Sequence, residues 1–406
     1  GSEIVHLAAY EGKLYASNGY WMDERGTKNP KQAAQVLRLD GPGQEWQVDL
    51  DTMRQADLRK VKLKGVQFAY TLRSTVLKDL HLTKDSAGRA IDKRILLTAS
   101  VAYLTMQGAS GICIFTKASG DGAWRNSHIF SNKAKGKKVP RDVHVWDDPA
   151  TGEQRVFLLI GDWGAVSGAF DSELDDIVWD TQPEKSAPKG KFDARALGME
   201  VVKGDLVFSV GGQLWQRKPF DKEWELAQDV GVNQEVNTEV GGIRGLTTLD
   251  AKGEDGSVIF IWTPDGSAKG EIKTLNLQSK KTTDETSLRD LYNRHARAGT
   301  GMGSSRYSLG GHNNFYPVTD PRTGKVARLF GFQSSLNGAT SDMHWHSYYR
   351  GATYGIRRGG RDYTVGEVGG RFTKGRTPLV TPRTMVMSPF ASERDVLYMA
   401  GFDANF

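Results

Sequence analysis

The sequence repeats a pattern of short apolar strands separated by turn residues. Runs with alternating or β-branched apolar residues recur about every ten residues, and Gly, Pro, Asn or Asp residues lie between them. The segment HLAAYEGKLYAS near the N-terminus is echoed by EVVKGDLVFSV in the middle of the chain, and a DDPATG turn is echoed by a later TDPRTG turn. This pattern of hairpins, without long amphipathic stretches, predicts an all-β chain.

Groups of four such strands fit within about fifty residues, the size of one propeller blade. We therefore predict a β-propeller that forms a single domain over residues 1–406. Seven four-stranded blades are expected, and six are the alternative. The last segment supplies only two strands, so either the N-terminal segment or residues beyond the C-terminus would complete its blade.

A short helix is expected at about residues 285–296, where the apolar residues fall on one face of a helix. Asp284 or Thr286 would cap its N-terminus. Its buried face would be formed by Leu288, Leu291 and Tyr292.

The composition fits many short strands joined by Gly-rich turns, with 47 glycines, 10 tryptophans and 38% hydrophobic residues. A net charge of +6 favours an anionic partner. The basic residues are dispersed, and the densest run, at 132–138, has the composition of a solvated loop, so we expect no nucleic-acid partner. The single cysteine, Cys113, is expected to be a small buried residue.

No apolar stretch reaches the length of a membrane span, so no membrane partner is expected. The chain begins with Gly-Ser, which resembles the remnant of a cleaved tag, and no signal peptide is visible. We expect a secreted or periplasmic protein that acts as a monomer.

The region 306–359 holds an unusual number of potential acids, bases and anion-binding groups: His312, His344, His346, Tyr316, Tyr348, Tyr349, Tyr354 and Arg350. In a propeller, the first strand of each blade lines the central channel, and ligands bind where these strands begin. Arg or His residues lie at five of the expected strand entrances, namely Arg141 with His144, Arg195, Arg244, His312 with Asn313, and Arg383.

These entrances predict an anionic ligand. Any single Arg or His could instead cap a strand end or contact a backbone carbonyl, but several guanidinium groups around one axis repel each other unless an anion lies among them. Acidic residues are scarce at the entrances, apart from Asp142. Aromatic residues in loops, Trp21 above all, offer faces for sugar rings. The sequence therefore predicts an acidic polysaccharide or oligosaccharide as the partner.

A metal site is the alternative use of the histidines. His344 and His346 alternate along an expected strand and point the same way, so they could bind zinc together with His312. Calcium-binding loops of the D-x-[DN]-x-[DN]-G type are absent from the sequence. We expect no cofactor, with zinc or calcium as the open alternatives.

A propeller funnel of Arg, His and Tyr resembles the secreted polysaccharide lyases of propeller fold, such as ulvan lyases and rhamnose–glucuronate lyases. The resemblance covers the architecture of most of the chain and is not a match of motifs. It implies β-elimination, in which Arg neutralises a uronate carboxylate, a His or Tyr removes the C5 proton, and a His or Tyr protonates the leaving oxygen at C4.

The expected catalytic residues are His144, His312, Tyr316 and Tyr349, with the two histidines on opposite sides of the funnel. The expected substrate-binding residues are Arg141, Arg195, Arg244, Asn313, Trp21, Arg350 and Arg383. One alternative is a propeller glycoside hydrolase, which would need paired carboxylates from Asp142, Asp162 or Asp342. The others are a non-catalytic carbohydrate-binding propeller, or lectin, and a scaffold for protein partners.

Overall fold

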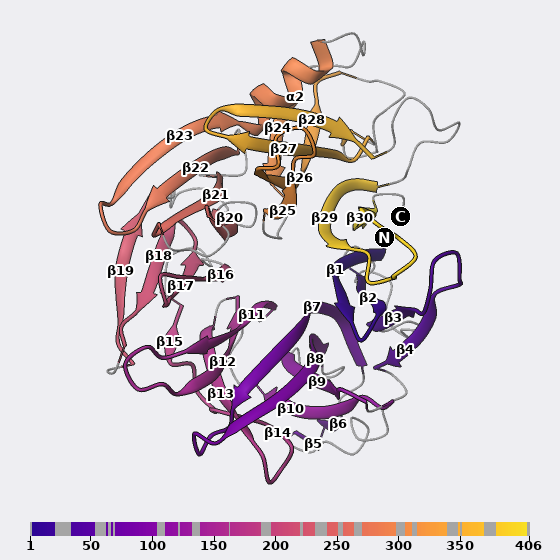
Figure 1. Cartoon of the computed structure of the whole chain (residues 1–406), viewed down its shortest axis with the longest axis vertical. Helices are drawn as coiled ribbons and strands as arrows, with labels where there is room; N and C mark the ends of the chain where they lie inside the picture. Colours follow the sequence, from indigo (N-terminus) through magenta and orange to yellow (C-terminus); the bar gives the residue numbers. More distant parts are fainter. Residues whose placement is uncertain are drawn as a thin grey trace. The chain divides into compact units, whose positions relative to one another are not determined.

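The chain is described by a computed structural model that covers residues 2–20, 34–52, 62–63, 66–67, 70–103, 110–120, 122–131, 139–161, 163–187, 196–219, 222–231, 242–250, 255–263, 270–297, 305–310, 315–338, 348–349, 351–368 and 379–403. Regular structure in these residues is almost entirely β (Figure 1). The chain divides into two compact units. Unit 1 comprises Gly1–Ala187 with Met385–Ala400 and Phe406, and unit 2 comprises Pro188–Thr384 with Gly401–Asn405.

Unit 1 is built from antiparallel meanders that follow the order of the chain. The first contains β1 (Ser2–Tyr10), β2 (Lys13–Tyr20), β3 (Gln35–Leu39) and β4 (Gln47–Asp51). The next contains β7 (Tyr70–Lys84), β8 (Ala90–Tyr103), β9 (Ser110–Ala118) and β10 (Arg125–Ser131), after a small hairpin of β5 (Lys62–Leu63) and β6 (Val66–Gln67). The third contains β11 (Pro140–Asp147), β12 (Gln154–Ile160), β13 (Gly164–Asp171) and β14 (Asp176–Trp179), and β15 (Lys185–Ser186) pairs with β13.

The C-terminal strands β29 (Leu379–Met387) and β30 (Leu397–Asp403) join the N-terminal meander. β30 pairs with β1, which gives the order β29-β30-β1-β2. The N-terminal segment therefore completes the sheet of the last two strands, the first of the two alternatives left open by the sequence.

Unit 2 continues the same pattern. One sheet is β16 (Ala196–Val202), β17 (Asp205–Val210), β18 (Gln213–Arg217) and β19 (Trp224–Asp229), and the next is β20 (Gly242–Thr248), β21 (Ser257–Thr263), β22 (Glu271–Asn276) and β23 (Lys281–Ser287). The third has the order β24 (Ser305–Gly310), β26 (Val326–Leu336), β27 (Thr353–Gly359) and β28 (Asp362–Glu367), with β25 (Tyr316–Thr319) also paired to β26.

The predicted fold class is confirmed: the described residues are nearly all β, and many of their strands form four-stranded antiparallel meanders of the kind that make propeller blades. The number of blades stays a prediction. β23 (KTTDETS) was not predicted from the sequence. It is an edge strand whose first four side chains are exposed, so it lacks the apolar alternation that marks a half-buried strand.

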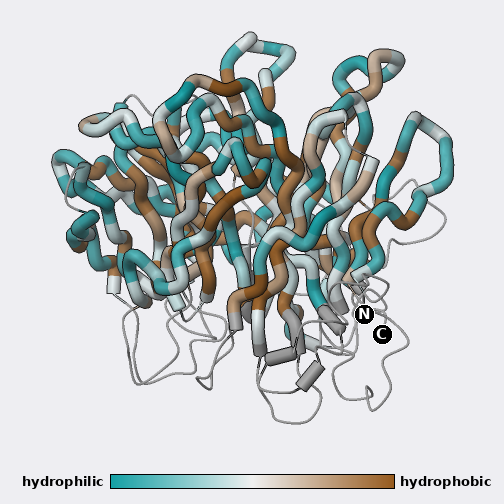
Figure 2. The backbone as a smooth tube through the Cα atoms, turned by 90° about the horizontal axis from the view of Figure 1, so that it is seen from below, coloured by the Kyte–Doolittle hydropathy of each residue, from teal (hydrophilic) through white to brown (hydrophobic). Residues whose placement is uncertain are grey.

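Apolar side chains are buried between successive sheets. In unit 1, Leu97 and Ile114 of the second meander pack with Leu158 and Val166 of the third, and all four are inaccessible to solvent. Cys113 is buried as expected. Figure 2 shows apolar residues concentrated along strands and hydrophilic residues in many of the turns. The alternation in the sequence thus corresponds to sheets whose faces pack on neighbouring sheets.

The repeated turn sequences form repeated turns. Glu11-Gly12 and Lys203-Gly204 join β1 to β2 and β16 to β17 with positive φ at both residues (49° and 70°, 53° and 85°), as a two-residue type I′ hairpin requires. In the two D-P-x-T-G turns, the backbone N–H of Gly152 donates to the carbonyl of Asp148 over 2.7 Å, and that of Gly324 donates to the carbonyl of Asp320 over 2.8 Å. In both turns the aspartate side chain accepts a backbone N–H two residues on.

The helix α2 (Leu288–Arg297) lies close to the predicted range. Leu288, Leu291 and Tyr292 are buried, as expected. The N-cap was predicted wrongly: the hydroxyl of Ser287 accepts the backbone N–H of Asp290 over 3.0 Å. The physical reason is that β23 extends to Ser287, so the residues proposed as caps still belong to a strand.

Candidate active site

Three strands of unit 1 bring together a cluster of ionisable side chains. β1 and β7 are in contact, and so are β7 and β11. We name the group His6, Lys78, Arg141, Asp142 and His144 the His6–His144 cluster. It contains two imidazoles and two cations around the carboxylate of Asp142.

Each of the three strands has a shift in register, of the kind that a β-bulge makes, near a member of this cluster. The register shifts between Ile4 and His6 in β1, between Ser74 and Val76 in β7, and between Pro140 and Asp142 in β11. A bulge inserts an extra residue, redirects the neighbouring side chains and is common beside active sites. Arg141 is itself an inserted residue, so its position does not follow the simple alternation of the strand.

Lys78, His144 and Asp142 make the closest contacts of the cluster. Lys78 Nζ lies 2.9 Å from His144 Nε2 and 3.6 Å from Asp142 Oδ1. His144 Nε2 lies 3.5 Å from Asp142 Oδ2. The side chains of His144 and Asp142 are 13% and 12% exposed, whereas that of Lys78 is 37% exposed. The ammonium group is therefore the member of this triad that a ligand could reach.

His6 is the most strongly perturbed base of the cluster. Burial lowers the pKa of His6 to about 4. The carboxylate of Asp142 and a hydrogen bond to the backbone of Thr75 oppose this shift, whereas the positive charges of Lys78 and Arg141 add to it. The imidazole is consequently neutral at neutral pH, with one ring nitrogen that can accept a proton.

The structure brings together some of the predicted site residues. Arg141 and His144 belong to the cluster, and so does Asp142, the one acidic residue noted at the strand entrances. His6 and Lys78 were missed. Both lie inside strands, His6 in the apolar run of β1 and Lys78 in the interior of the long strand β7, whereas the site was expected at the entrances of strands.

Of the predicted site residues in unit 2, the structure describes four. Tyr349 is 6% exposed and belongs to an apolar core, where its ring lies 5.6 Å from that of Tyr292. Its catalytic role stays a prediction. Tyr316 is partly buried at the start of β25. Arg244 is 5% exposed and donates to the carbonyl of Gly310 over 3.2 Å.

The guanidinium group of Arg383 lies 5.3 Å from the ring centroid of Phe402. Arg244 thus contacts a backbone carbonyl, which was the structural alternative for these arginines, whereas Arg383 contacts an aromatic ring. Their substrate-binding role stays a prediction.

The remaining predicted site residues lie outside the described part of the chain, namely His312, Asn313, Arg195, Trp21 and Arg350. The same holds for His344, His346, Asp162 and Asp342, so the zinc alternative and the paired carboxylates remain predictions. Within the described ranges, no group of three or more His, Cys, Asp or Glu residues could hold a metal ion. No helix there is long and apolar enough to cross a membrane.

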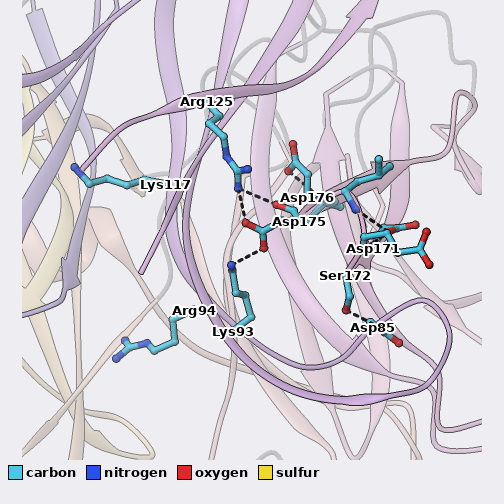
Figure 3. Close-up of polar contacts among 12 residues, drawn as sticks. Asp85, Lys93, Arg94, Lys117, Arg125, Asp171, Ser172, Asp175 and Asp176 are labelled. Carbon is cyan, nitrogen blue, oxygen red and sulfur yellow. Dashed lines mark hydrogen bonds and ion pairs between the residues drawn. The ribbon is translucent and has the colours of Figure 1, made fainter. Parts of the chain in front are cut away.

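A second polar cluster of unit 1 connects two sheets (Figure 3). Asp175, in the turn between β13 and β14, pairs with Lys93 of β8 over 2.5 Å and with Arg125 of β10 over 3.4 Å. The side chain of Asp175 is 47% exposed. Its neighbour Asp176 accepts the hydroxyl of Ser127 over 2.7 Å. Because Asp175 pairs with two cations of the neighbouring sheet and Asp176 accepts a hydroxyl from the same sheet, we assign this cluster a structural role.

The chain was compared with known proteins. No family model and no curated protein matches it. Among solved structures, it is similar to the periplasmic gluconolactonase of Pseudomonas aeruginosa (12% identity, 90% of this chain and 88% of that chain, TM-score 0.46). It is also similar to an α-L-arabinofuranosidase of Fusarium graminearum (9% identity, 90% and 93%, TM-score 0.40) and to a GH43 endo-arabinanase of Bacillus licheniformis (8% identity, 89% and 92%, TM-score 0.36).

None of these three structures is named as a lyase, so the resemblance to propeller polysaccharide lyases is not shown by them.

Proposed function

We propose that the protein is a carbohydrate-active enzyme that binds a carboxylate-bearing sugar at the His6–His144 cluster and cleaves it by β-elimination. The observation that carries this proposal is the neutral imidazole of His6 beside the cations Lys78 and Arg141. β-Elimination from a uronate needs these two elements together: cations that bind the carboxylate, and a neutral base that takes the adjacent proton.

In the proposed step, Lys78 and Arg141 bind the uronate carboxylate and stabilise the negative charge that develops when C5 loses its proton. The unprotonated ring nitrogen of His6 accepts that proton. The electron pair of the C5–H bond forms the C4–C5 double bond, the C4–O bond breaks, and the leaving oxygen takes up a proton from water, which is replaced when His6 releases the C5 proton to the solvent. The products are an unsaturated uronate and a shortened chain, with no oxidant or reductant consumed.

Hydrolysis of the glycosidic bond is the second candidate. Asp142 favours it, because glycosidases use carboxylates as acids, bases and nucleophiles. The reaction ordinarily needs a second carboxylate across the bond, and Asp162 and Asp342, the two other aspartates considered in the sequence, lie outside the described residues. Two of the similar structures are named as enzymes of this class, but hydrolysis is a candidate because of Asp142 alone.

Both candidates are tested by incubating the protein with a panel of uronate-containing polysaccharides and, as controls, neutral polysaccharides of similar length. β-Elimination is expected to raise the ultraviolet absorbance of an unsaturated uronate together with new reducing ends. New reducing ends without this absorbance would show hydrolysis instead. Binding without either product would show a lectin, and cleavage of only neutral polymers would refute the proposed recognition of a carboxylate.

A further inference from the structure

The contact between Lys78 and His144 assigns a specific role to the histidine. Lys78 Nζ and His144 Nε2 are 2.9 Å apart, a normal length for a hydrogen bond between nitrogens. An ammonium group only donates hydrogen bonds, so His144 Nε2 must be the acceptor and must carry no proton. A nitrogen that already accepts from Lys78 is not available to take a proton from a sugar.

We propose that His144 is a positioning residue, not the acid or base, and that it holds the Lys78 ammonium in place to bind the acidic group of the ligand. This inference rests on the proposed function for the identity of the ligand, but the proton position on His144 can be tested without any ligand.

The surroundings of the pair support this role. The side chain of His144 is 13% exposed and that of Lys78 is 37% exposed, so the imidazole is the inner partner and the ammonium is the outer one. Asp142 lies within 3.6 Å of the ammonium and 3.5 Å of the imidazole. A lysine has four flexible bonds and loses much entropy when it is fixed. The acceptor nitrogen of His144 on one side and the carboxylate of Asp142 on the other restrict the Lys78 ammonium before the ligand binds.

The same geometry gives the two histidines of the cluster different roles. His6, whose ring is tied to the backbone of Thr75, is the imidazole with a nitrogen left for a proton. His144 is the imidazole whose Nε2 is occupied by Lys78. The sequence could not separate these roles, because both residues are single histidines in apolar strands.

The direct test is the protonation pattern of His144 in the free protein. Selective ¹⁵N-histidine labelling, with His144→Gln used to assign the signal, should show Nδ1 protonated and Nε2 unprotonated at neutral pH. Replacing Lys78 by Met, which keeps the aliphatic stem, should shift the Nε2 signal. A protonated Nε2 in the wild-type protein would overturn the proposal, whether or not the protein acts on sugars.

The second test separates positioning from direct contact by a double-mutant cycle, with sodium D-glucuronate as the probe and D-glucose as the neutral control. His144→Leu removes the acceptor and should weaken glucuronate binding about tenfold, the usual effect of losing a hydrogen bond to a charged group. His144→Gln restores an acceptor near the place of Nε2 and should stay within about threefold of the wild type. In the Lys78→Met background, His144→Leu should have no further effect.

Equal losses from His144→Leu in both backgrounds would mean that His144 contacts the ligand directly, which would refute the positioning role. If the wild-type protein does not bind glucuronate, the proposed function fails for this class of sugar, and the ¹⁵N measurement still decides the role of His144. Circular dichroism of each variant checks that the β structure is retained.

Discussion

The imidazole of His6 on β1 is hydrogen-bonded to the backbone of Thr75 on β7, at the bulge that follows Ser74. A polar ring is thus fixed between two strands that lie far apart in the sequence. Its low pKa follows from this partly buried position beside two cations. The effect of this low pKa on folding stability and its effect on turnover can be measured separately.

The first prediction concerns acid stability. The pKa of His6 falls from its ordinary 6.5 to about 4 in the folded protein, so the unfolded chain binds the proton more readily between these values. The stabilisation that comes from the neutral ring is complete above pH 6.5 and is lost as the pH falls toward 4. Urea unfolding should show that lowering the pH from 7 reduces the free energy of unfolding more in the wild type than in His6→Gln. An NMR titration of the His6 ring with a midpoint near 6.5 would contradict the assignment.

The second prediction concerns turnover. If His6 is the base, His6→Gln should lower kcat/KM on the best uronate polymer by about a hundredfold or more, while the fold is retained. The acid limb of the wild-type pH profile should lie nearer pH 4 than 6.5, because only the neutral ring accepts a proton. An acid limb that is unchanged in His6→Gln would assign the base to another residue.

The sequence predicted the strands better than the site. Turn chemistry such as Lys203-Gly204 and the D-P-x-T-G turns is local, so it could be recognised from a few residues. The polar edge strand β23 lacked that local signal. The cluster depends on pairing between strands and on bulges, which redirect side chains such as Arg141, and neither is visible in one sequence. Lys78 was missed for this reason, since a lysine inside a strand ordinarily indicates an exposed face.

The third prediction concerns Tyr349, whose ring packs against Tyr292 and other core residues of unit 2. Tyr349→Phe keeps the ring and should leave turnover within about threefold of the wild type, since a catalytic hydroxyl would be worth at least a hundredfold. Tyr349→Ala creates a cavity and should destabilise the protein by about 3–5 kcal/mol. Thermal unfolding and turnover of both variants test this. A large loss of turnover in Tyr349→Phe, with normal stability, would restore the catalytic role expected from the sequence.

The last prediction concerns a buried ion pair between β9 and β4. Lys117 Nζ lies 2.8 Å from Asp49 Oδ2, and both side chains are 5% exposed. Asp49 also accepts the indole N–H of Trp124 over 2.7 Å and pairs with Arg38. Removing the carboxylate leaves the Lys117 charge buried, whereas removing Lys117 leaves Asp49 with its two other partners.

Asp49→Asn should therefore cost about 3 kcal/mol or more, and Lys117→Met should cost clearly less. Asp175→Asn is the matched control, because Asp175 also has two cationic partners but its side chain is 47% exposed, so the change should cost less than about 1 kcal/mol. The free energies of unfolding in urea decide between these outcomes. Similar losses of unfolding free energy for Asp49→Asn and Asp175→Asn would mean that burial of the ion pair does not determine its contribution to stability. A larger loss for Lys117→Met than for Asp49→Asn would mean that Lys117 stabilises the protein mainly through its contacts with the rings of Tyr15 and Trp124.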